Sequence, residues 1–267
     1  MRRYLSSKRL AALVLVGVMA LPGLVLTAPL VTGSAGFSGS PIAFSTTQAI
    51  ATNWAGYVGG GAVGSVTLVS GTWTEPAVTC GSAVAGVVFW VGIDGVYSPS
   101  TTVEQTGTFA YCAGGGAAPA YYAWWEMYPA NDIQLISKIT VSVGDEFKAS
   151  VSWASATDKF TLKIEDVTTG VKFATTTTQA STEENSAECI AERPSQSSGL
   201  LDLPDFGSVK FSSCTATIAG VSGGIGKDKT LLEITMTSSL KSPYTVLATP
   251  SSLTGKKEFT VTWDASS

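Results

Sequence analysis

One short segment, Ala187 to Pro194, carries two carboxylates, those of Glu188 and Glu192. If the segment is a β-strand, side-chain alternation places Glu188, Ile190 and Glu192 on one face, with Cys189 on the other. The two carboxylates then lie about 13 Å apart at ~3.3 Å per residue. Carboxylates can act as general acids and bases, so this strand is a candidate for proton-transfer chemistry.

A third carboxylate lies in an aromatic segment, residues 120–128. Alternation places Tyr122, Trp124, Glu126 and Tyr128 on one face. The opposite face is also aromatic, so this segment is not an ordinary solvent-exposed strand. Aromatic residues in β-proteins usually pack in a core, but they can also line a ligand cleft. The carboxylate of Glu126 needs a partner or a ligand in such surroundings.

Two further polar residues end or interrupt apolar segments. Asp94 follows the apolar run from Phe89 and precedes a glycine, which is typical of a turn. Gln105 follows Glu104, and the two side chains point to opposite faces if this segment is a strand. Composition alone does not single out Gln105.

The sequence contains no histidine. This excludes Ser-His-Asp and Cys-His catalysis and histidine-ligated zinc, and leaves acid–base chemistry to carboxylates, Lys, Tyr or Cys. Two glycine-rich stretches, 59–61 and 223–227, lack the Lys-Ser/Thr of a phosphate-binding loop and are predicted to be plain loops.

The elements that must position these residues have a period of two. About a dozen short strands are predicted, and no 3.6-residue apolar stripe occurs after residue 35. The fold class is therefore all-β, a sandwich of two packed antiparallel sheets such as a concanavalin- or lectin-like jelly roll. The predicted strands cover residues 65–73, 87–94, 101–109, 120–128, 139–153 with a turn at 144–145, 160–166, 171–178, 187–192, 209–218, 230–237, 244–248 and 258–263.

The N-terminus has the pattern of an export signal, a basic start followed by an uncharged apolar run. We expect a signal peptide or membrane anchor over residues 1–35, a linker or short pro-segment over 36–50, and one domain over 51–267. Four of the 16 basic residues and none of the 20 acidic ones precede Gly36, which leaves 12 against 20, a net charge of −8. This charge argues against nucleic-acid binding.

Four cysteines, Cys80, Cys112, Cys189 and Cys214, are an even number in an exported protein, so two disulfides are expected. Three connectivities are possible. No CxxC pair is present, which argues against a cysteine-only zinc site. We expect neither a metal nor a cofactor.

Five motifs, in this order, resemble those of the eqolisins, or glutamic peptidases. The resemblance covers residue 52 to the C-terminal strands. The motifs are Asn53-Trp54-Ala55-Gly56, Trp90 to Gly95, Gln105-Thr106-Gly107, Ala123 to Pro129, and Ala187 to Glu192.

The resemblance implies a β-sandwich of two seven-stranded sheets that cleaves peptide bonds at acid pH with a glutamine–glutamate dyad. The dyad would be Gln105 and Glu192, because the family's catalytic glutamate is the second acid of its strand. Trp54, Trp124 and Glu126 would lie at the substrate cleft, as matches to that family's motifs.

The same resemblance places Asp94 near the dyad and among the substrate-binding residues. If Cys189 pairs with Cys214, the bridge would hold the catalytic strand from behind and leave Cys80 to pair with Cys112. An ordinary glutamate pKa near ~4.3 would leave Glu192 able to act as a base in mild acid.

The expected function is thus that of a secreted, monomeric acid endopeptidase acting on polypeptides. Two alternatives remain at this point. One is a carbohydrate-binding or carbohydrate-hydrolysing sandwich, with Glu126 and Glu192 as paired carboxylates. The other is a peptidase-like scaffold that binds polypeptide without turnover.

Overall fold

A computed structural model describes residues 47–97, 100–196 and 199–267. The described residues form eighteen strands and one 3-10 helix, with no α-helix among them, which confirms the all-β prediction. No helix in these ranges is long and apolar enough to span a bilayer. The elements are β1 (Thr47–Ala51), β2 (Trp54–Gly60), β3 (Val66–Thr74), β4 (Val84–Ile93), β5 (Val103–Ala113), β6 (Ala120–Tyr128), β7 (Gln134–Leu135), β8 (Glu146–Ala154), β9 (Lys159–Asp166), β10 (Val171–Thr177), β11 (Ser186–Glu192), β12 (Ser195–Gln196), β13 (Gly199–Leu200), β14 (Ser208–Ile218), β15 (Val221–Gly224), η1 (Ile225–Lys227), β16 (Leu232–Thr237), β17 (Val246–Pro250) and β18 (Phe259–Trp263).

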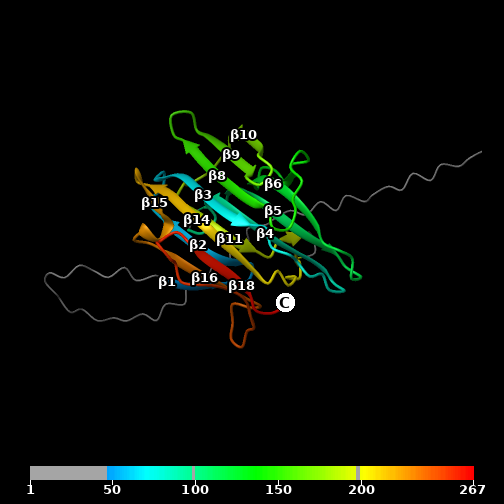
Figure 1. Ribbon diagram of the computed structural model, residues 1–267. Coiled ribbons are helices and arrows are strands. Elements are labelled where there is room, and N and C mark those ends of the chain that lie inside the picture. The colour runs from blue at the N-terminus through cyan, green and yellow to red at the C-terminus, as the bar shows by residue number, and fades with distance from the viewer. Residues whose placement is uncertain (1–46, 98–99, 197–198) are drawn as a thin grey trace, which may run out of the picture.

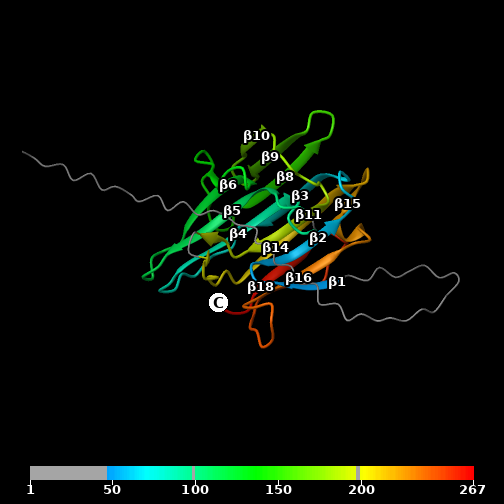
Figure 2. The same ribbon diagram turned by 180° about the vertical axis from the view of Figure 1, so that it is seen from behind.

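The strands form a sandwich of two antiparallel sheets (Figures 1 and 2). Sheet I has the order β10-β9-β8-β3-β14-β18, and sheet II has the order β16-β2-β11-β4-β5-β6-β7. The two are joined at one edge by β17, which pairs with β18 and with β16. Strand β3 contacts β4 and β11 across the sandwich, and β5 contacts β8 and β9. The predicted architecture is therefore confirmed.

The core between the sheets is held by one of the two disulfides. Cys189 of β11, in sheet II, is bonded to Cys214 of β14, in sheet I. Cys80 is bonded to Cys112 at the end of β5. Of the three possible connectivities, this is the one expected if Cys189 pairs with Cys214. The Cys189 side of β11 therefore faces sheet I, and Glu188 and Glu192 must face away from it.

The outer face of sheet II is also buried. A second apolar cluster covers it, with Trp54, Trp90, Trp124 and Ile190 among its members. Strand β4 is consequently buried at nine of its ten positions. Burial on both faces explains why this segment reads as a nearly continuous apolar run instead of an alternating one.

The glycine-rich segments were predicted wrongly as loops. Gly59 and Gly60 lie in β2, a central strand that the sequence pattern did not reveal, and Gly223 and Gly224 lie in β15. In β2, a Cβ atom on Gly56 would lie 2.2 Å from the carbonyl oxygen of Cys189. This strand needs glycine because its backbone lies so close to β11.

Two predicted boundaries also change. The linker expected over residues 36–50 extends too far, because residues 47–50 already pair with β16 in parallel. The strand expected from Ile139 begins only at Glu146. Ile139 and Val141 are both buried, but their segment does not pair with another strand. The alternating apolar pattern there reflects burial and not strand pairing. The expected signal segment, residues 1–35, lies outside the described residues.

Candidate active site

Glu192 ends β11 on the outer face of sheet II and is completely buried. Both of its oxygens accept hydrogen bonds. Asn53 Nδ2 donates to Oε1 at 3.3 Å, and Trp90 Nε1 donates to Oε2 at 2.8 Å. Trp54 pairs with Glu192 in the β2–β11 ladder, and its ring meets that of Trp90 edge to face with centroids 5.0 Å apart. The carboxyl group is thus enclosed by two indoles and an amide.

This enclosure changes the acidity expected of Glu192. Burial raises its pKa to about 8, because a carboxylate loses hydration there, while the side-chain donors of Trp54, Asn53 and Trp90 act in the opposite direction. The expectation of an ordinary glutamate pKa was therefore wrong for this arrangement. The carboxyl group holds its proton in acid until water or substrate reaches it.

Gln105 lies on the same face, in β5, and is 1% exposed. Its Nε2 donates a hydrogen bond of 2.7 Å to Oε2 of Glu126. The two residues are direct partners in the β5–β6 ladder. Glu126 is completely buried as well, so a short polar contact is shielded from solvent. The carboxylate of Glu126 therefore has the partner that its aromatic surroundings required.

The ladder does not make Gln105 and Glu192 direct neighbours. Gly92 of β4 pairs with Gln105 on one side and with Glu188 on the other, whereas Glu192 pairs with Val88. Among the described hydrogen bonds, none joins the two members of the expected dyad. Any reaction that uses both must place its substrate and water across the intervening part of β4.

Trp90 occupies that intervening part of β4. A Cβ atom on Gly92 would lie 2.6 Å from a ring carbon of Trp90, and one on Gly107 would lie 2.7 Å from the Cβ of Trp90. Glycine at both positions therefore leaves the space that the Trp90 side chain takes up. The sequence motifs around these glycines reflect the packing of one indole against the sheet.

Asp94 has a different setting from the one expected of a cleft residue. Its carboxylate accepts hydrogen bonds from the backbone N–H groups of Glu183, Glu184 and Asn185, at 2.8 to 2.9 Å. It is completely buried and has a positive φ of 72°. These contacts match the turn chemistry that the sequence predicts, since Asp tolerates the left-handed region and holds nearby backbone.

Glu188, the other acid on β11, has neighbours of its own sign. Burial raises its pKa well above the ordinary value, and the carboxyl groups of Asp94 and Glu104 raise it further. Burial likewise raises the pKa of Glu104, with Asp94 again adding to the effect. This end of β11 therefore favours protonated carboxyl groups.

Trp124 lies two residues from Glu126 on the same face and is completely buried in the outer cluster. It pairs with Gly107 of β5. Of the residues contacting Glu192, sequence reasoning did not single out Asn53 or Trp90. Asn53 begins the motif that contains Trp54, and Trp90 begins the motif that ends at Gly95. Their places in these motifs could have identified them.

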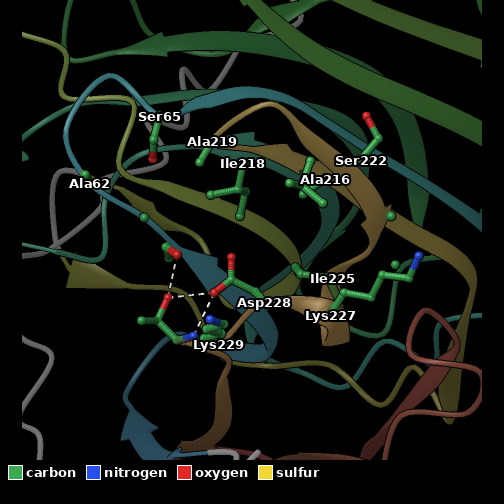
Figure 3. Close-up of a pocket in the computed structure, with 16 residues that line it drawn as sticks. Ala62, Ser65, Ala216, Ile218, Ala219, Ser222, Ile225, Lys227, Asp228 and Lys229 are labelled. Carbon is green, nitrogen blue, oxygen red and sulfur yellow. Dashed lines mark hydrogen bonds between the residues drawn. The ribbon is translucent and has the colours of Figure 1, made fainter.

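A cavity of about 460 Å³ lies elsewhere in the sandwich (Figure 3). It is bounded by the end of β2, by β14 and β15, and by η1. Ile218, Ile225 and Lys227 are among its lining residues, and neither Gln105 nor Glu192 is. The cavity is therefore separate from the site on the outer face of sheet II.

Comparison with known proteins gives consistent matches. Residues 52–263 match the model of the peptidase A4 family. The chain is 32% identical over 215 residues to aspergillopepsin-2 of Aspergillus niger, covering 71% of this chain and 72% of that protein.

Solved structures agree with the sequence matches. Scytalido-glutamic peptidase, solved with a transition-state analogue inhibitor, has 26% identity and a TM-score of 0.65, covering 80% of this chain and 98% of that one. Aspergilloglutamic peptidase from Aspergillus niger has 30% identity and a TM-score of 0.57, covering 67% and 99%.

Proposed function

This chain belongs to the peptidase A4 family, the eqolisins or glutamic peptidases, and is an acid endopeptidase; we propose that it cleaves peptide bonds with Gln105 and Glu192. The observation that carries the assignment of Glu192 is its pair of hydrogen-bond donors. A carboxylate accepts hydrogen bonds at both oxygens, and both oxygens here face an N–H group. Glu192 is thus surrounded by groups that stabilise its ionised form.

In the proposed reaction, Glu192 removes a proton from the attacking water and later returns it to the leaving amine. Its pKa of about 8 in the buried state means that it begins as an acid at low pH. Water that enters with the substrate rehydrates the carboxyl group and lowers this pKa, because burial is its main cause. The entry of substrate and water therefore also converts Glu192 into a base.

Gln105 supplies both a hydrogen-bond acceptor and a neutral N–H donor, which an ionised carboxylate cannot. Its amide oxygen accepts a hydrogen bond from the water, and its amide N–H donates to the oxyanion that forms on the peptide carbonyl. An amide has no charge to lose in acid, so this role persists where a histidine would be protonated. The absence of histidine from the chain costs such a mechanism nothing.

We propose further that the enzyme is secreted and acts as a monomer on polypeptides without metal or cofactor. The basic and apolar N-terminus and two disulfides support export. The peptide-based transition-state analogue bound to scytalido-glutamic peptidase supports a polypeptide substrate.

The test is cleavage of a denatured protein by the purified protein at about pH 3 to 4, where ordinary carboxyl groups titrate. We expect cleavage that resists pepstatin. Gln105→Ala and Glu192→Gln should each abolish it while circular dichroism and melting temperature show an intact fold. If wild-type protein cleaves nothing across the acid range, the proposal is wrong.

A further inference from the structure

We propose that Glu126 is a positioning residue, which fixes the side-chain amide of Gln105 in the one orientation that serves catalysis. The inference rests on the proposed role of Gln105. It replaces the expected contact between Glu126 and substrate with a role exerted through the neighbouring side chain.

The geometry of the pair supports this role. Gln105 and Glu126 lie opposite each other in adjacent strands, and the 2.7 Å bond between Nε2 and Oε2 is short for an N–H donor. Both side chains are buried, at 1% and 0% exposure. A hydrogen bond shielded from water in this way is electrostatically stronger than the same bond in solvent.

The chemistry of the pair determines the orientation of the amide. A glutamine amide can be turned over, exchanging its oxygen and nitrogen at little steric cost. In this structure Oε2 of Glu126 accepts from the NH₂ end of Gln105, and the amide oxygen, which can only accept, could not make that bond. Glu126 therefore selects one of two otherwise similar orientations of Gln105.

The orientation so fixed leaves the groups that the reaction requires. Within the described part of the chain, Oε1 of Gln105 is buried and has no hydrogen-bond partner. One N–H of the NH₂ group is used by Glu126, and the second remains for the oxyanion. In the reversed orientation the amide oxygen would meet the carboxylate, and the acceptor for the water would be lost.

The first experiment separates positioning from substrate contact by steady-state kinetics. Glu126→Gln keeps the size of the side chain but can accept or donate, so it no longer selects one orientation of Gln105. We expect kcat to fall roughly 10- to 100-fold, as misplacement of a reacting group does, with little change in KM. A rise in KM at unchanged kcat would overturn the proposal.

A matched control comes from the adjacent residue of β5. Glu104 is also a completely buried glutamate, but it faces the opposite side of the strand from Gln105. Glu104→Gln should leave kcat within about twofold of the wild-type value, as expected for a substitution outside the site. An equal loss in both variants would mean that removing any buried acid near β5 impairs the enzyme, and would also overturn the proposal.

The second experiment is a double-mutant cycle read by binding, which does not require activity. Calorimetry would measure a peptide-based transition-state analogue against wild type, Gln105→Ala, Glu126→Gln and the double variant. We expect Glu126→Gln to weaken binding about tenfold in the wild-type background and not at all beside Gln105→Ala, because coupled residues are not additive. The same factor in both backgrounds would indicate a direct substrate contact and overturn the proposal.

Different results would contradict the proposed dyad and the proposed positioning role of Glu126. If Gln105→Ala retains full activity and analogue affinity, the proposed dyad is wrong. If Gln105→Ala is inactive but Glu126→Gln matches wild type, only the positioning role is wrong. Should Glu126→Gln fold poorly by melting temperature, Glu126→Asp keeps the carboxyl group and shortens its reach. It should lower kcat as well, and wild-type kcat in that variant would contradict the proposal.

Discussion

The two ends of β11 carry the same residue type on the same face, yet they differ in chemistry. Glu188 and Glu192 are both completely buried. Around Glu192 lie the donors Asn53 and Trp90. Around Glu188 lie other acids, Asp94 and Glu104, which raise its pKa beyond the effect of burial. Burial is equal at the two ends, so the neighbours make the difference.

The neighbours of Glu192 and Glu188 explain why the first suits catalysis and the second does not. A general base must lose and regain a proton within the reaction, which requires donors that stabilise its ionised form. Glu192 has these donors. Glu188 ionises only against the negative potential of nearby carboxyl groups, so it suits a permanently neutral role. The strand register alone favours Glu188 instead as the partner of Gln105, because Gly92 pairs with both of them.

The largest expected effect decides between these two glutamates. Glu192→Gln should lower kcat/KM by about 10³-fold or more, in the range found when a catalytic base is removed. Glu188→Gln should retain activity within a few-fold. Peptide cleavage at acid pH measures both. The reverse result would move the dyad to Gln105 and Glu188, as the ladder register alone suggests.

A smaller effect is expected from weakening the donors around Glu192. Trp90→Phe removes the indole N–H that bonds Oε2 while keeping an aromatic ring. We expect kcat to fall about tenfold and the pKa of Glu192 to rise, since a charge-assisted bond contributes ~1.5–3 kcal/mol. The pH profile of kcat/KM would report both changes.

A matched control for the loss of an indole N–H is Trp153→Phe. Trp153, at a partly exposed position of β8 in sheet I, donates its Nε1–H to Asp158 in the turn after β8. This variant should match wild-type activity. If Trp90→Phe also leaves the pH profile unchanged, the donor does not act on the reacting carboxyl group.

The smallest expected effect is on stability against pH. Folded-state pKa values of Glu75 and Glu192 are raised to about 8, mainly by burial, and those of Glu104 and Glu188 are also raised. A raised pKa means that the folded state binds more protons than the unfolded state. Each such carboxyl group therefore stabilises the fold fully below the unfolded pKa near ~4.3. This stabilisation is lost as pH rises toward about 8. We expect the melting temperature to fall by about 5 °C or more between pH 4 and 8.

Single substitutions test which acids cause this fall. Glu188→Gln and Glu75→Gln should each make the melting temperature less dependent on pH, because a glutamine does not ionise. Only buried carboxyl groups should act in this way. Glu165→Gln, at a partly exposed acid paired with Lys172, serves as the control. A melting temperature that rises steadily from pH 4 to 8 in the wild type would contradict this reading of the buried acids.

Much of the fold could be predicted because alternation reports burial directly. The strands around Gln105 and Glu192 lie close to their predicted bounds. Strand β2 was missed because its three glycines are typical of loops. Gly56 is needed for close contact with β11, whereas Gly59 and Gly60 leave room for side chains of other segments, such as Ile218 and Tyr97. The stretch after Ile139 shows the opposite error, since it alternates in burial without pairing.

The site was predicted less completely than the fold. Gln105, Glu126 and Glu192 share one face, as alternation and the family resemblance implied. The surroundings of each residue were not predictable. The bond between Gln105 and Glu126 depends on the β5–β6 register, and the high pKa of Glu192 depends on the cluster that covers sheet II.

Composition and a period of two are enough to specify the fold class, the absence of histidine chemistry and the shared face of Glu188 and Glu192. Which of the two glutamates has hydrogen-bond donors depends on residues that only the fold brings near. Asn53 and Trp90 lie 139 and 102 residues from Glu192 in the chain. Local periodicity cannot specify such neighbours, since they are set by the order and register in which distant strands pair.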